Sequence, residues 1–120
     1  MRLMLASALV SVAVVTSAAA QSKQDFTLVN RTGYDISEVY ISPSKADDWQ
    51  EDVLGDDELG DGVQTRIRFK RAGNTCRWDL KVVYSVDDSS AVWSNVDLCK
   101  ISKITIKYNR KNDQTSALFD

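Results

Sequence analysis

The chain alternates apolar and polar residues in several short segments, which is the pattern of half-buried β-strands. The clearest is segment 63–69, where every second residue faces one side: Val63, Thr65, Ile67 and Phe69. Segment 75–86 alternates in the same way, with an apolar face of Cys76, Trp78, Leu80, Val82 and Tyr84. Shorter alternating runs occupy 25–30, 34–42, 91–96 and 102–108.

Residue types that favour turns, mainly Gly, Asn, Asp and Ser, separate these runs. Short strands with frequent turns predict an all-β fold, an antiparallel β-sandwich or small barrel of about six to seven strands. Gly33 predicts a hairpin between 25–30 and 34–42, and a change of phase near Ser37 predicts a β-bulge. The polar residues after Asn109 are expected to be loose.

Segment 45–54 departs from the alternation and predicts one short helix. Pro43 suits the start of a helix and Gly55 suits its end. Trp49 and Val53 are spaced at i, i+4, so they share a helical face. We therefore expect one or two helical turns that dock onto the sheet through Trp49.

The first twenty residues have the features of an export signal. Arg2 precedes an apolar run, 3–15, and Ala18 and Ala20 occupy the positions of a small-residue cleavage site. About 13 apolar residues are too few for a bilayer span, which needs roughly 20. We expect cleavage after Ala20, a periplasmic or extracellular location, and one domain at 21–120.

The net charge and the cysteine count narrow the functional class of the protein further. Of the 15 Lys and Arg residues, only Arg2 lies before residue 21, which leaves 14 against 17 Asp and Glu and a net charge of −3. This acidic balance argues against nucleic-acid binding. Cys76 and Cys99 form an even pair in an exported chain, which predicts a disulfide.

The absence of several residue types excludes most catalytic chemistry. The chain contains no histidine, the commonest general base and metal ligand. Bridged cysteines leave no thiol nucleophile, and no glycine-rich phosphate loop is present. A pair of carboxylates is the remaining option. We assign no catalytic residues and expect no enzymatic activity.

Eight of the 17 acidic residues lie within 47–61. Calcium binds several oxygens from flexible loops. One hypothesis is therefore a calcium site, but the spacing does not match the EF-hand loop and we assign no cofactor. The alternative is a solvated acidic surface whose first acids complement a helix dipole. The residues of the calcium hypothesis are Asp47, Asp48, Asp52, Asp56, Asp57 and Asp61.

Basic residues are concentrated on two strands. Arg66, Arg68 and Lys70 share the outward face of one, and Arg77 and Lys81 share that of the next. If these strands pair, they form a positive stripe that docks an acidic protein, an anionic glycan or a lipid surface. The alternative is a solvated face with salt bridges. Trp49 is a further partner contact under the first hypothesis, although burial in the core is favoured for it.

Several motifs resemble those of a family of small exported bacterial domains of unassigned function. They are Asn30-x-Thr32-Gly33-Tyr34, Tyr40-Ile41-Ser42-Pro43-Ser44, Asp47-Asp48-Trp49, Leu54-Gly55, Cys76-x-Trp78-Asp79-Leu80 and Asp97-Leu98-Cys99. The resemblance covers nearly the whole mature chain and implies no activity. Some similar sequences are named argininosuccinate lyase, but such lyases are much longer helical tetramers.

We therefore expect an exported small binding or structural domain without catalysis. Its partner is expected to be a protein or an envelope component, and the mature chain is expected to have no membrane span. Two alternatives remain: a calcium-stabilised structural module, and an inhibitor of an extracellular hydrolase.

Overall fold

The computed structural model describes residues 23–46, 48–69 and 74–120. These residues form seven β-strands and no helix, so the predicted all-β fold is confirmed. The expected signal at 1–20, Asp47 and Lys70 lie outside the described residues. The strands are β1 (Phe26–Arg31), β2 (Ile36–Pro43), β3 (Gln64–Ile67), β4 (Arg77–Tyr84), β5 (Ser90–Asp97), β6 (Lys103–Asn109) and β7 (Gln114–Phe119).

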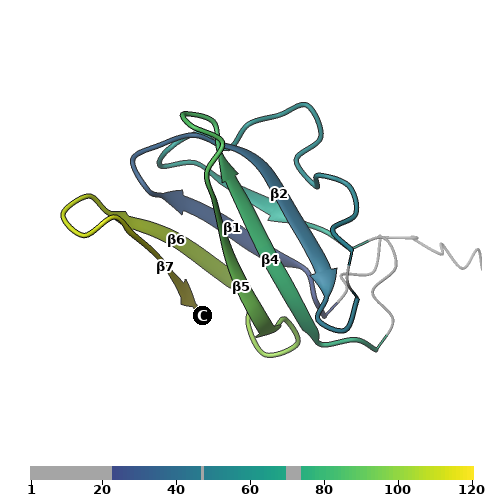
Figure 1. The fold of residues 1–120 in the computed structure, drawn as a ribbon. Coiled ribbons are helices and arrows are strands. Elements are labelled where there is room, and N and C mark those ends of the chain that lie inside the picture. The colour runs from purple at the N-terminus through teal and green to yellow at the C-terminus, as the bar shows by residue number, and fades with distance from the viewer. Residues whose placement is uncertain (1–22, 47, 70–73) are drawn as a thin grey trace, which may run out of the picture.

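The strands form two sheets that make the two layers of a sandwich (Figure 1). The larger sheet has the order β3-β1-β6-β7, and the smaller has the order β2-β4-β5. Every pairing in the described part is antiparallel except that of β1 with β6, which is parallel. Thr27 of β1 lies between Arg66 of β3 and Lys103 of β6 in the register of the larger sheet.

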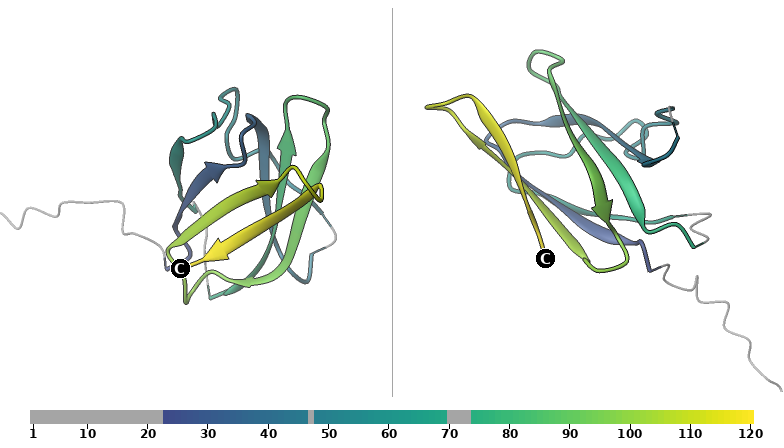
Figure 2. Two further views of the ribbon diagram at one scale, coloured as in Figure 1. Left: turned by 90° about the vertical axis from the view of Figure 1, so that its left-hand side faces the viewer. Right: turned by 60° about the horizontal axis from the view of Figure 1, so that its bottom comes forward.

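Both sheets contribute to one hydrophobic core, because strand geometry turns every second side chain inward. Phe26 and Leu28 of the larger sheet and Val82 of the smaller sheet are all 0% exposed and belong to the same cluster. Two leucines outside the strands, Leu59 and Leu98, complete it. The β6–β7 hairpin and the long connection from β2 to β3 lie on opposite sides of this core (Figure 2).

The predicted hairpin between the first two strands is wrong, because β1 and β2 lie in different sheets. The buried side chain of Asn30 provides the physical reason. Its Nδ2 donates to the carbonyl oxygens of Tyr34 at 2.7 Å and Leu59 at 2.9 Å, and its Oδ1 accepts the N–H and hydroxyl of Thr32. With Gly33 at a φ of 85°, these bonds turn the chain toward the other sheet.

The predicted β-bulge in the second strand is confirmed. The register of β2 against β4 shifts between Ile36 and Glu38. One extra residue therefore restores the inward direction of both halves, and Ile36 and Val39 are each 0% exposed.

The helix predicted over 45–54 is wrong for the described residues, which form turns at 45 and 53–54 and irregular structure between them. The N–H of Val53 donates to the carbonyl of Val39, and the carboxylate of Asp52 accepts the N–H groups of Val39 and Leu54. These bonds tie the segment to the neighbouring strand and satisfy backbone groups that a helix would need. Interactions with β2 thus override the local helix signals.

The expectation of a loose end after Asn109 is also wrong. β7 pairs with β6 from Asn109↔Gln114 to Ile104↔Phe119. The hydroxyl of Tyr108 donates to the carboxylate of Asp113, which closes the turn between the two strands. The hairpin is therefore part of the larger sheet.

The predicted disulfide between Cys76 and Cys99 is confirmed. It joins the residue before β4 to the turn after β5, and the N–H of Leu98 donates to the carbonyl of Cys76 at 2.9 Å beside it. No helix within the described ranges is long and apolar enough to cross a bilayer.

Candidate functional site

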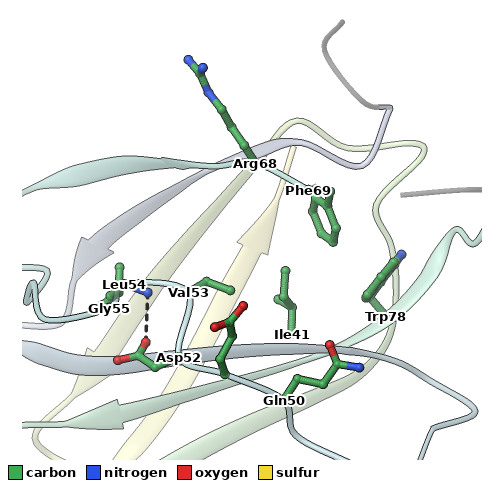
Figure 3. A pocket seen from close by; sticks show the side chains of 10 residues that line it. Ile41, Gln50, Asp52, Val53, Leu54, Gly55, Arg68, Phe69 and Trp78 are labelled. Carbon is green, nitrogen blue, oxygen red and sulfur yellow. Dashed lines mark hydrogen bonds between the residues drawn. The ribbon is translucent and has the colours of Figure 1, made fainter. Parts of the chain in front are cut away.

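A groove of about 640 Å³ opens on the side of the sandwich where β2 and β3 form the sheet edges. Segment 50–55 lines one side, and Arg68 and Phe69, which follow β3, line the other. Ile41 and Trp78 complete the lining. Phe69, Ile41 and Val53 point toward the same space, whereas the side chain of Arg68 extends away from it (Figure 3).

Aromatic side chains make the inner wall of the groove rigid. The rings of Phe69 and Trp78 meet edge to face with centroids 4.8 Å apart, and Phe69 also contacts Phe26 at 6.3 Å. The indole Nε1 of Trp78 donates to the carbonyl of Thr75 at 3.0 Å, so its one polar group is satisfied within the protein. The faces that remain are apolar, which suits an apolar ligand group.

Asp52 positions the opposite wall. Its Oδ1 accepts the N–H of Val39 at 2.8 Å and the N–H of Leu54 at 3.0 Å. The Leu54 bond is drawn in Figure 3. Ser42 adds a bond from its hydroxyl to the carbonyl of Asp48 at 2.8 Å. Bonds at Asp48, Asp52 and Val53 therefore attach this part of the connection to β2, although it has no regular secondary structure.

The groove borders the most acidic part of the chain. Residues 48–61 contain seven carboxylates and no Lys or Arg. Among the described residues, ion pairs join only Asp97 to Arg77 and to Lys100, so no carboxylate of 48–61 is neutralised by one. The charge on this side of the groove is therefore negative, which favours cationic groups on a ligand, whereas Arg68 is the cation on the other side.

Asp47 lies outside the described residues, and no three of the other acids of the calcium hypothesis meet in one group. Oδ1 of Asp52 accepts the N–H groups of Val39 and Leu54, and Asp61 accepts the N–H of Gly33 at 2.8 Å. Asp48, Asp56 and Asp57 are exposed. Within the described ranges the single group of three metal-ligand atoms lying within 4.8 Å of one another is Cys76, Asp97 and Cys99. Two of those three are the bridged sulfurs, so that group cannot supply thiolate ligands.

The predicted basic stripe is wrong, because its two strands do not pair. β3 pairs with β1, and β4 pairs with β2 and β5. The edge-to-face contact of Phe69 with Trp78 gives the reason: β4 and the end of the β3 segment face each other across the core, where Trp78 is buried and Phe69 is partly buried. Arg66 consequently lies on one sheet and Lys81 on the other.

Trp49 lies outside the core, contrary to the favoured expectation. It is half-buried, and the Lys81 ammonium lies 6.0 Å from its ring centroid and 5.6 Å from that of Tyr40. The Tyr40 hydroxyl donates to Glu38 at 3.0 Å, which raises the pKa of Tyr40. Arg77 is exposed on the same strand as Lys81 and donates to the carbonyl of Asn95 at 3.1 Å.

Sequence reasoning did not identify the groove. Trp78 and Phe69 were expected on strand faces, and the proximity of Val53 and Ile41 to them depends on the path of the connection after β2. The available signal was an apolar Val53-Leu54 pair inside an otherwise acidic segment.

The chain has no detectable relative in the comparisons with known proteins. No family model, no curated protein and no solved structure matches it.

Proposed function

We propose that this protein is an exported, non-catalytic binding domain whose groove receives an apolar side chain from an extended segment of a partner protein. The observation that carries the proposal is the convergence of Ile41, Val53, Phe69 and Trp78 around one open groove. Its volume of about 640 Å³ is typical of ligand sites in proteins.

The charge around the groove supports a partner that is basic beside its apolar residue. Glu51 is exposed at the lip, and five further exposed carboxylates lie in the described part of 48–61. Cationic side chains that flank an inserted apolar group would approach this surface favourably. Much of that contribution is expected in the association rate and in its dependence on salt.

The chemistry of the groove also supports binding without turnover. Asp52 has its Oδ1 engaged by two backbone N–H groups, the chain has no histidine, and both thiols are bridged. A proton-transfer pair would have to come from Glu51 and a second acid. Binding an apolar side chain needs none of these catalytic groups.

A peptide panel tests the proposal by calorimetry on the purified protein. The peptides are Lys-Lys-Phe-Lys-Lys and its variants with Leu or Ala at the centre, together with Glu-Glu-Phe-Glu-Glu. We expect the Phe and Leu peptides to bind and the Ala and Glu peptides to bind at least about tenfold more weakly, a difference of about 1.4 kcal/mol.

Matched valine variants locate the binding. Val53 is 37% exposed at the groove and Val92 is 52% exposed on β5, so both accept glutamate without filling a core position. Val53→Glu is expected to weaken the Phe peptide about tenfold or more, and Val92→Glu to leave it unchanged. Equal effects of both variants, or equal affinity for the Phe and Ala peptides, would refute the groove as the site.

A further inference from the structure

The outward face of the larger sheet carries four cations. Alternation along β1 sends Leu28 and Asn30 into the core, so Thr27, Val29 and Arg31 lie on the opposite face, where Arg31 is exposed, Thr27 is half-buried and Val29 is buried. The register then places Arg66 and Lys103 on either side of Thr27, and Lys107 beside Arg31. Residues opposite each other in a ladder share a face, so all four cations project from the same side.

These cations have no acidic partner within the described residues, whose ion pairs all involve Asp97. Arg31, Arg66, Lys103 and Lys107 are exposed, and the one side-chain hydrogen bond among them joins Arg66 to the Thr27 hydroxyl at 3.4 Å.

Two carboxylates lie only at the margin of this face. Asp25 precedes β1, is 6% exposed and accepts the N–H of Phe69. Asp120 follows β7 and donates its own N–H to the carbonyl of Lys103. The exposed charges of this face are therefore positive and lie around the buried Val29 and Thr105, although the chain as a whole is acidic.

The cations lie in two rows across three neighbouring strands: Arg66 and Lys103 flank Thr27, and Arg31 lies beside Lys107. Adjacent strands are about 4.8 Å apart and residues rise about 3.3 Å along a strand. Arg66 and Lys103, two strands apart, are therefore separated by about 10 Å, and Lys103 and Lys107 by about 13 Å. Leu118 is 49% exposed and lies beside Thr105 on the same face.

We propose that this face docks on the surface of a bilayer that contains anionic phospholipid. Four cations on one side of a sheet match an array of anionic head groups, and the exposed Leu118 at the margin suits the boundary between head groups and acyl chains. Each basic residue near such a surface contributes favourably, and the contribution is lost as salt rises. The acidic residues 48–61 lie in the connection between β2 and β3, outside this face, so the charge asymmetry also orients the protein.

Vesicle sedimentation of the purified protein tests the proposal. The vesicles are phosphatidylcholine alone, or phosphatidylcholine with about a third phosphatidylglycerol. Binding is expected only to the mixed vesicles, and it should fall at least about tenfold between about 10 mM and about 1 M salt. Equal binding to both lipids, or none to the mixed vesicles, overturns the proposal.

Two double variants with the same change in net charge separate the face from the charge of the whole chain. Arg66→Glu with Lys103→Glu is expected to lower partitioning at least about tenfold. Lys45→Glu with Lys81→Glu, both away from this face, should lower it much less. Melting temperatures check that each variant folds, and Arg66→Gln with Lys103→Gln replaces the first variant if it does not.

A soluble polyanion tests the alternative that this face binds a soluble anionic ligand and not a membrane. Inorganic polyphosphate that binds the protein strongly while mixed vesicles do not would assign the face to a soluble ligand and overturn membrane docking. An equal loss of vesicle binding in both double variants would do the same.

Discussion

Asn30 is 0% exposed and uses both hydrogens of its amide and both lone pairs of its carbonyl oxygen. Asp52 holds two backbone N–H groups that no strand partner satisfies. Each side chain replaces a missing backbone partner at a bend, which is why the chain turns there. Such bonds join residues as far as 29 positions apart, so the alternation of apolar residues does not reveal them.

Tyr108 provides a pH-dependent test at the scale of one residue. Its hydrogen bond to Asp113, together with the charge of that group, raises the pKa of Tyr108 to about 12. Because the neutral phenol is the favoured form, this contribution to stability is complete below the unfolded pKa of about 10 and is lost as pH rises toward about 12. The pKa values of Tyr40 and Tyr84 are also raised, so near-ultraviolet absorbance should show several late tyrosines, with the Tyr108 step near pH 12.

Two variants assign this late ionisation. Tyr108→Phe should remove it, and Asp113→Asn should move it back toward the ordinary pKa, since asparagine tolerates the φ of 54° at that position. A tyrosine step near pH 12 that persists in Tyr108→Phe would contradict the assignment.

At the scale of elements, six of the seven strands follow from alternation alone. The seventh, β7, lies among polar residues, and its inward side chains Thr115 and Ala117 are small and only half-buried. Its pairing with β6 and the turn at Asp113 hold it in place. The prediction of a short helix was wrong for a related reason. Hydrogen bonds to β2 replace the intrahelical bonds that local residue preferences favour.

The disulfide is the covalent link between elements. It closes a loop 23 residues long in sequence, which corresponds to about 3 kcal/mol by the chain-entropy estimate. Replacing both cysteines, Cys76→Ala with Cys99→Ala, should lower the free energy of unfolding by about this amount in urea denaturation. The bond from Leu98 to Cys76 should keep the fold intact in the variant. A loss below about 0.5 kcal/mol would show that the bridge constrains little.

At the scale of the whole molecule, the two sheets divide the charges. The positive face belongs to the larger sheet, and the acidic residues lie on the connection that leaves β2 and enters β3. The sequence pattern identified both sets of charges but wrongly predicted that Arg66 and Lys81 lie on one surface. Strands that follow each other along the chain can belong to different sheets of a sandwich, as β3 and β4 do. The groove depends on the same long-range arrangement, since its walls come from β2, segment 50–55, the end of β3 and β4.

The most direct test of the groove is a two-dimensional amide NMR titration of isotope-labelled protein with Lys-Lys-Phe-Lys-Lys. We predict saturable shifts at Val53, Phe69 and the Trp78 indole N–H, with no comparable shifts at Val92 or Arg31. The Ala-centred peptide should leave the indole resonance in place at the same concentration. Shifts spread only over the exposed acidic residues, or shifts of equal size with both peptides, would contradict insertion of an apolar side chain into the groove.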